Sequence, residues 1–197
     1  MKVIGITGNS GSGKSTIAKI IKEKYNGIII DADKIAKEMT NTNSEYLEKI
    51  IKTFGMKIIK NNKLDRKELS KIVFNDKKEK EKLDKLTFKY IVDEIKNRIK
   101  ILKEKNEIII LDIPLLFESK LNELCDFVIG VIADEKEKIA RICKRDDINQ
   151  EEAFKRIKSQ PKDKFYIENS NYIINNSNMK NLNIEIEKII KNLNITK

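Results

Sequence analysis

Nine residues near the start of the chain, Gly8 to Thr16, combine glycine, small polar residues and one lysine in the order GNSGSGKST. The first eight match the pattern G-x-x-x-x-G-K-[ST] at every constrained position. Wrapping a phosphate needs inward-facing backbone N–H groups, which glycine permits at little steric cost. Lys14 is expected to reach the β- and γ-phosphates of ATP, and the Ser15 hydroxyl to ligate Mg²⁺. The residues expected to bind nucleotide here are Gly8, Asn9, Ser10, Gly11, Ser12, Gly13, Lys14, Ser15 and Thr16.

Two aspartates follow the second apolar segment, in the stretch IIIDADKIAKE. Ligands of open α/β sheets bind at the carboxyl ends of the strands, where Asp31 and Asp33 are expected to lie. We favour Asp33 as the catalytic group that accepts or orients the proton of an acceptor hydroxyl. Asp31 would hold Mg²⁺ through water or fix the turn. The structural alternative is that Asp33 only caps the helix that starts there.

The third apolar segment ends in IIILDIPLLFES. Four apolar residues followed by Asp112 are typical of the acidic partner of Mg²⁺ in nucleotide-splitting proteins, so the expected metal residues are Ser15 and Asp112. Leu115, Leu116 and Phe117 either pack under the sheet or form an apolar wall for a substrate, with Glu118 just beyond them.

Basic residues gather between positions 141 and 158: Arg141, Lys144, Arg145, Arg156 and Lys158. Arg141 and Arg145 are one helical turn apart on one face. A lid carrying arginines would exclude water and neutralise the charge that develops on the phosphates. Arg145 is therefore a catalytic candidate, and Arg141 and Arg156 are nucleotide-binding candidates. The alternative is a solvated basic helix.

Short β-branched segments at 2–7, 27–31, 107–112 and 127–133, and a weaker one at 172–176, indicate buried parallel strands. Amphipathic helical patterns at 14–25, 134–146 and 184–193 alternate with them. This order predicts an α/β fold with a parallel sheet and flanking helices. Helical patterns fill most of 32–105, and two helical pieces joined at 146–149 fill 143–164, so both segments read as insertions.

Composition limits the classes of function. The chain has 197 residues, a net charge of +10 and no histidine, which excludes a histidine-dependent triad. No basic stripe is interleaved with aromatic residues, which argues against a nucleic-acid groove. No apolar run approaches about 18 residues and no secretory signal precedes the first strand, so a cytoplasmic protein without a membrane partner is expected. The motif NKLD at 62–65 resembles a guanine-reading pattern, but an asparagine-rich turn that caps the next helix explains it better.

The sequence resembles the dephospho-CoA kinases, a family of P-loop kinases, over nearly its whole length. The resemblance rests on GITGNSGSGKSTIAK, DADKIAKE, LDRKELSKIVFND, DIPLLFES, the stretch 125–160 and NYIINNSN, in the family's order. It implies a P-loop NTPase-type core at 1–31, 106–142 and 165–197, a helical substrate-binding insertion at 32–105 and a small lid at 143–164. One departure is Phe88-Lys89, where the family usually has His-Pro.

The resemblance also implies that ATP and Mg²⁺ serve to phosphorylate the ribose 3′-hydroxyl of dephospho-CoA, the last step of coenzyme A synthesis. Asp33 would be the base, and Arg145 and Arg156 would be lid arginines. The expected substrate-binding residues are Asp31, Asp33, Leu115, Leu116, Phe117 and Glu118. The expected partners are small molecules only, in a monomer or weak homo-oligomer. The rival hypotheses are a nucleoside or nucleotide kinase and, more remotely, an ATP-dependent nucleic-acid-binding protein.

Overall fold

The computed structural model describes residues 2–39, 44–61, 63–103, 108–113, 115–177 and 181–193, without the side chains of Phe74, Asn75 and Lys103. The chain forms two compact units, which are described separately below. The first unit contains residues 1–30 and 101–197, and the second contains residues 31–100. The functional division into core, insertion and lid stays a prediction.

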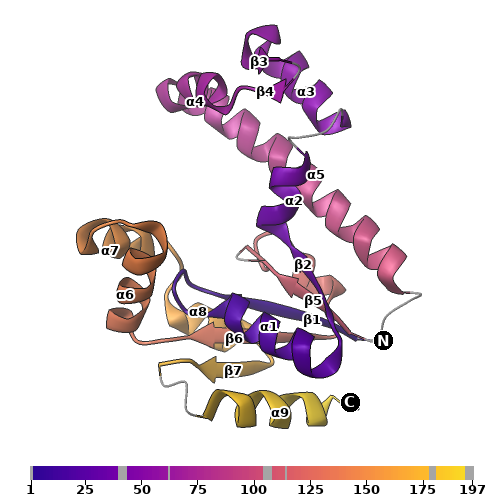
Figure 1. Cartoon of the computed structure of the whole chain (residues 1–197), viewed down its shortest axis with the longest axis vertical. Helices are drawn as coiled ribbons and strands as arrows, with labels where there is room; N and C mark the ends of the chain where they lie inside the picture. Colours follow the sequence, from indigo (N-terminus) through magenta and orange to yellow (C-terminus); the bar gives the residue numbers. More distant parts are fainter. Residues whose placement is uncertain are drawn as a thin grey trace. The chain divides into compact units, whose positions relative to one another are not determined.

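A five-stranded sheet organises the first unit (Figure 1). Its order is β2-β5-β1-β6-β7, and β1 pairs in parallel with both β5 and β6, as β6 does with β7. All five predicted strands are present within a residue or two of their expected bounds, and residue 107 lies outside the described residues. The strands are β1 Lys2–Gly8, β2 Ile28–Asp31, β5 Ile108–Asp112, β6 Phe127–Ile132 and β7 Tyr172–Asn175.

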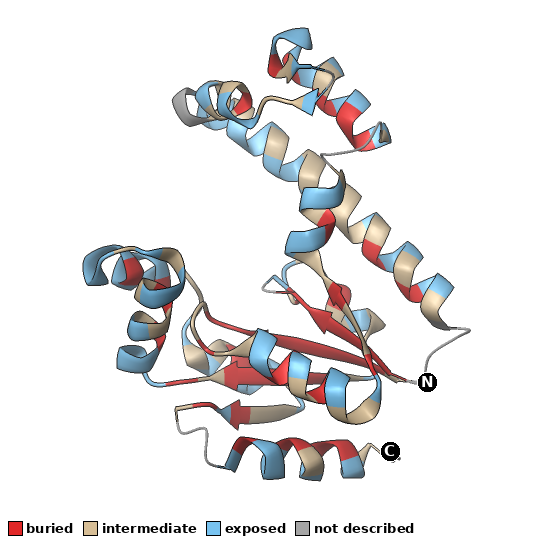
Figure 2. Cartoon of the chain, viewed as in Figure 1, coloured by how far each residue is buried: buried red, intermediate tan, exposed pale blue. Residues whose placement is uncertain are grey.

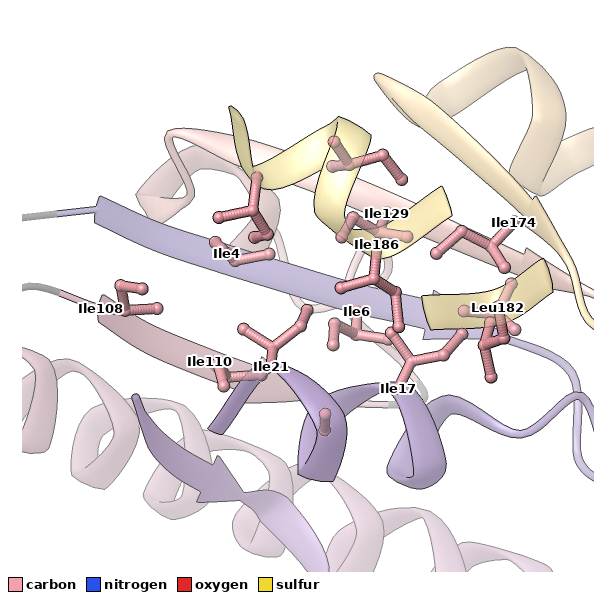
Figure 3. Packing of buried hydrophobic residues seen from close by; sticks show 14 residues of the cluster. Ile4, Ile6, Ile17, Ile21, Ile108, Ile110, Ile129, Ile174, Leu182 and Ile186 are labelled. Atoms are coloured by element: carbon pink, nitrogen blue, oxygen red, sulfur yellow. The ribbon is translucent and has the colours of Figure 1, made fainter. Parts of the chain in front are cut away.

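Two helices, α1 Lys14–Tyr25 and α9 Leu182–Asn192, cover one face of this sheet. Side chains alternate between the faces of a strand, and Ile4 and Ile6 of β1 therefore point together into this layer. Figure 3 shows Ile6 between Ile17 of α1 and Ile186 of α9. The sheet strands are largely buried in Figure 2, which explains their nearly continuous apolar sequences.

The opposite face of β6 contacts α8 Asp163–Asn169. Gly5 leaves room there for Leu116 and Cys125, because a Cβ at Gly5 would lie 2.7 Å from a methyl group of Leu116 and 2.8 Å from the Cys125 sulfur. Burial raises the pKa of the Cys125 thiol to about 12, so this side chain behaves as an apolar packing group. In the described ranges, no helix combines the length and apolar character needed to cross a membrane.

Two further helices, α6 Glu135–Asp146 and α7 Gln150–Lys158, pack on each other through Ile142, Ala153 and Ile157. Asn149 and Glu152 form a reciprocal capping box at the start of α7. The helix ends at Lys158, shortly before Pro161.

The second unit is mainly helical and is built around Tyr46, Ile50, Phe54, Ile58 and Leu69. Tyr46 and Tyr90 make an edge-to-face contact with ring centroids 5.6 Å apart. The 27-residue helix α5 is continuous through Phe88-Lys89, as expected where the helix lacks a proline. The elements are α2 Ala32–Met39, α3 Glu45–Phe54, the 3₁₀ turn η1 Met56–Ile58, β3 Ile59–Lys60, β4 Lys63–Leu64, α4 Arg66–Asn75 and most of α5 Lys77–Lys103.

The NKLD stretch forms part of a small hairpin and a helix cap. β3 and β4 pair as an antiparallel hairpin with Asn61 in the left-handed region, and Asn62 lies outside the described residues. The Asp65 carboxylate accepts hydrogen bonds from the backbone N–H groups of Lys67 and Glu68 at the start of α4. The predicted capping role of this segment is confirmed.

Two isoleucines of α9 provide a matched test of the core. Ile186 is fully buried, whereas Ile184 is 54% exposed on the same helix. We expect Ile186→Ala to lower the free energy of unfolding by about 2–5 kcal/mol, because it leaves a cavity, and Ile184→Ala to change it by about 0.5 kcal/mol or less. Urea unfolding followed by circular dichroism measures both. Equal effects would contradict the assignment of this face.

Candidate functional site

The loop between β1 and α1 contains three glycines with positive φ: Gly8 (144°), Gly11 (77°) and Gly13 (96°). Their neighbours also leave no space for a side chain. A Cβ at Gly8 would lie 2.2 Å from the Val131 carbonyl oxygen, and one at Gly11 would lie 2.5 Å from the Lys138 carbonyl oxygen. At Gly13 it would lie 2.0 Å from an Asn176 amide nitrogen. Glycine is therefore required by the packing of the loop as well as by its backbone angles.

Side chains from later elements hold the carbonyl side of this loop. The Asn176 amide donates to the Ser12 carbonyl at 2.8 Å, and the Arg141 guanidinium donates to the Gly11 and Ser12 carbonyls at 3.2 and 3.4 Å. A trans peptide directs its C=O and N–H to opposite sides. The N–H of Gly13, which shares a peptide unit with the Ser12 carbonyl, is thereby turned away from Arg141 and Asn176.

The loop leads directly into the N-terminus of α1. Gly13 is its N-cap residue and makes no side-chain capping bond. The first N–H groups of a helix have no partner inside the helix, and the helix dipole favours negative charge there. The Lys14 ammonium lies across the loop and donates to the Gly8 and Asn9 carbonyls at 2.9 and 3.1 Å. The helix N-terminus and the Lys14 ammonium both belong to this loop region, and a polyphosphate requires N–H groups and a cation of this kind.

Buried polar atoms without a partner also concentrate at this loop. In the described part of the chain, four buried side-chain atoms lack a hydrogen-bond partner. Three belong to the loop or to the side chain that contacts it: Asn9 Oδ1, Ser12 Oγ and Asn176 Oδ1. Such atoms are uncommon in folded proteins, and their gathering here fits a site that binds a polar ligand.

The two predicted metal residues lie in contact. The Ser15 hydroxyl donates to Asp112 Oδ2 at 2.7 Å, although 97 residues separate them in the chain. The parallel register of β1 and β5, which pairs Ile6 with Asp112, brings the carboxylate to the loop. Asp112 is only 9% exposed. Hydroxyl and carboxylate oxygens are the hard donors that Mg²⁺ prefers, so the residues present fit this ion.

The basic residues of 141–158 divide into two groups. Arg141 contacts the loop, and it also donates to the Asn176 carbonyl at 2.8 Å. Arg145 and Arg156 both donate to the Asp146 carboxylate. The hydrogen bond from Arg145 is the main cause that lowers the pKa of Asp146 to about 2. Both arginines are thus oriented by one carboxylate at the end of α6, and their contact with nucleotide stays a prediction.

The apolar segment after β5 is partly buried and partly exposed, and its contact with a substrate stays a prediction. Leu116 is fully buried, so this side chain packs under the sheet. Leu115 is 52% exposed, and Phe117 makes an edge-to-face contact with Phe165 at a centroid distance of 5.5 Å. Glu118 is exposed. Any substrate surface here would have to come from Leu115, Phe117 and Glu118, and Pro114 lies outside the described residues.

The two aspartates of DAD belong to the second unit, and they differ in their local roles. Asp31 Oδ1 accepts from the backbone N–H groups of Asp33 and Lys34 at 2.9 and 3.1 Å. Asp31 therefore caps α2, and Asp33 lies in the first turn of the helix. The alternative that Asp33 is the cap is wrong, whereas the turn-fixing role considered for Asp31 is confirmed.

Several residues at the loop were not anticipated. Gln160, Asp163, Lys138 and Asn176 all bond to loop residues or to each other. The first three also line a cleft of about 480 Å³ with Asn9, between the ends of β6 and α7 and the start of α8. The only sequence signal was the position of Gln160 and Asn176 just after α7 and β7, whereas Lys138 lies within α6 and Asp163 begins α8.

Comparison with known proteins places this site in a family. A model of the family described as dephospho-CoA kinase matches residues 2–181. The chain is 42% identical to a dephospho-CoA kinase from Fusobacterium nucleatum subsp. nucleatum, over 97% of this chain and 98% of the relative. It is 35% identical to one from Bacillus cereus, over 98% of each chain.

Solved structures agree with these relatives. A dephospho-CoA kinase from Campylobacter jejuni superposes with a TM-score of 0.71 at 32% identity, covering 97% of this chain and 96% of that one. A shikimate kinase from Acinetobacter baumannii shares the fold alone, with a TM-score of 0.56 at 14% identity over 98% of this chain and 93% of that one. The chain belongs to the dephospho-CoA kinase family.

Proposed function

We propose that this protein transfers the γ-phosphoryl group of ATP to the ribose 3′-hydroxyl of dephospho-CoA, giving coenzyme A and ADP. The observation that carries the proposal is the family match over residues 2–181. The loop geometry supports it, because the loop gathers N–H groups and the Lys14 cation at a helix N-terminus. Phosphoryl transfer depends mainly on positioning and on neutralising charge, and both are what this loop offers.

The chain's own residues divide the work in the proposed mechanism. The loop N–H groups and Lys14 bind the phosphates and neutralise the charge that develops on them. Ser15 and Asp112 would hold Mg²⁺, which supplies further neutralisation of phosphate charge when bound. Arg141, Arg145 and Arg156 are proposed to complete the positive surroundings of the nucleotide.

Asp33 is proposed as the base that accepts the proton of the acceptor hydroxyl. The local structure supports this division of roles, because Asp31 already uses Oδ1 to cap α2. A carboxylate that fixes a turn holds the helix start in place, and the next acidic residue in the turn is then available for chemistry. Asp31, Leu115, Phe117 and Glu118 remain proposed substrate residues, whereas Leu116 is fully buried and is no longer one of them.

The proposed partners are small molecules, in a cytoplasmic protein that works as a monomer or weak homo-oligomer. The net charge of +10 favours encounter with two polyanionic substrates. A nucleoside or nucleotide acceptor would use the same loop, and it remains the main rival reading of the loop geometry. A nucleic-acid partner would instead show strongly salt-dependent binding.

A panel of acceptors tests the proposed reaction. With purified protein, ATP and Mg²⁺, we expect dephospho-CoA to be phosphorylated and nucleosides and nucleotides to react far more slowly. Coupled ADP release measures all acceptors under the same conditions. Ready phosphorylation of a nucleoside, with no reaction of dephospho-CoA, would refute the assignment of the acceptor.

Asp33→Asn tests the proposed base. Losing a general base lowers the rate of the chemical step, so we expect kcat to fall by about 10²–10⁴-fold while the Kd for ATP is nearly unchanged. Steady-state kinetics and ATP titration measure the two quantities. Asp84→Asn is a matched control on the exposed face of α5, where Asp84 pairs only weakly with Lys80 at 3.7 Å.

The contrast with Lys14→Ala sharpens this test. Lys14 is proposed to act on the phosphates in both the bound and the transition state, so its loss should weaken ATP binding and lower kcat together. Wild-type turnover by the Asp33 variant would remove Asp33 from the mechanism, whatever the Lys14 variant does.

Asp112→Asn tests the proposed metal residues. The amide can still accept the hydrogen bond from Ser15, but it lacks the charge that attracts a divalent cation. We expect the Mg²⁺ concentration for half-maximal rate to rise by about 10–100-fold. The rate is measured against Mg²⁺ at fixed ATP. An unchanged Mg²⁺ dependence would show that Asp112 does not serve the metal.

A further inference from the structure

A short segment just after α7 reaches back to the phosphate-binding loop. The Gln160 side chain accepts a hydrogen bond from the Ser10 backbone N–H at 2.8 Å, and its amide donates to the Ser10 hydroxyl at 3.0 Å. The two residues are 150 positions apart in the chain. Gln160 therefore makes two hydrogen bonds to Ser10, one through its side-chain oxygen and one through its side-chain nitrogen.

The other end of this segment is anchored on an ion pair between a buried lysine and a partly exposed aspartate. Asp163 accepts from the Lys138 ammonium at 2.9 and 3.0 Å, and also from the Asn9 amide at 3.2 Å. Lys138 is only 4% exposed, and Asp163 is the carboxylate that pairs with it at 2.9 Å. Consecutive loop residues, Asn9 and Ser10, are thus held by one four-residue segment, Gln160 to Asp163.

The contact at Ser10 bears on the position of Lys14. The N–H of Ser10 and the C=O of Asn9 belong to the same peptide unit, and a trans peptide points them to opposite sides. Gln160 holds the N–H side, so the Asn9 carbonyl faces the other way. There it accepts from the Ser12 N–H at 3.1 Å and from the Lys14 ammonium at 3.1 Å.

The Asn9–Ser10 peptide opens a tight turn. Asn9 to Ser12 form a four-residue turn with Gly11 at φ 77°, closed by the hydrogen bond from the Ser12 N–H to the Asn9 carbonyl. Gly8, which supplies the other carbonyl for Lys14, is held by its close approach to Val131. Of these two carbonyls, the one of Asn9 belongs to the peptide whose N–H donates to Gln160.

We propose that Gln160 is a positioning residue for Lys14: by holding the Asn9–Ser10 peptide it sets the carbonyl that places the lysine ammonium. This inference rests on the proposed function, because it deepens the role of the same loop. It also ties ATP binding to the segment that follows the lid helix, since Gln160 lies two residues beyond the end of α7.

Gln160→Met tests the proposal, because it keeps the size of the side chain and removes both hydrogen bonds. We expect the Kd for ATP with Mg²⁺, measured by titration calorimetry, to rise about tenfold, the change expected for a lost hydrogen bond to a partly buried group. The KM for dephospho-CoA should stay within about twofold of wild type. Gln150→Met makes the same chemical change at an exposed position of α7, and we expect it to bind ATP like wild type.

The same substitution in a Lys14→Ala background separates positioning from a merely structural role. If Gln160 acts through Lys14, Gln160→Met should cost less than about twofold in ATP affinity once the lysine is gone. Gln160→Asn, which keeps an amide but is too short to reach Ser10, serves as a second variant and should behave like Gln160→Met. If thermal unfolding shows that Gln160→Met does not fold, the ATP affinity of Gln160→Asn is compared with and without Lys14 instead.

Wild-type ATP affinity in folded Gln160 variants would overturn the proposal, and so would an equal loss with and without Lys14. The ATP-binding measurement can also be interpreted independently of the proposed reaction. A wild-type protein that binds ATP but does not phosphorylate dephospho-CoA would refute the acceptor, whereas the ATP titrations would still decide the role of Gln160.

Discussion

The orientation of a few peptide units between β1 and α1 is the constraint on which the rest of the site depends. A phosphate-binding loop must expose N–H groups on one side, so its carbonyls need partners on the other. Asn176 and Arg141 provide partners for Ser12 and Gly11, and Lys14 bonds to Gly8 and Asn9. Without these partners the carbonyls would compete with an anion for the same space.

The sheet explains why those partners are present. β1 lies at its centre, between β5 and β6, so the ends of both neighbours flank the loop. β5 brings Asp112 to Ser15, and β6 leads into α6, which carries Arg141 and Lys138. β7, beside β6, ends next to Asn176. The sheet order therefore sets the surroundings of the loop, and the apolar core between α1, α9 and the strands holds that order in place.

Glycine at three loop positions serves two requirements that sequence reasoning separates poorly. The predicted reason was that wrapping a phosphate needs inward-facing backbone N–H groups, which glycine permits. The structure adds a second, because Cβ atoms at Gly8, Gly11 and Gly13 would collide with Val131, Lys138 and Asn176. The motif therefore identified the glycines correctly. The second reason for them, the lack of space for a Cβ atom, comes from neighbours more than a hundred residues away in the chain. DAD shows the opposite case, since the prediction weighed capping at Asp33 whereas Asp31 is the cap.

The sequence by itself determined the glycine-rich loop, the five strands, the helix that follows the loop and the choice of Ser15 and Asp112 as candidate metal residues. These are local signals, because spacing, periodicity and turn chemistry act over a few residues. Only the tertiary structure decided that Gln160, Asp163, Lys138 and Asn176 surround the loop, and that Arg145 and Arg156 share Asp146. Contacts between residues far apart in the chain follow from strand order and helix placement. The sequence around a polar side chain contains no pattern that identifies its distant partner.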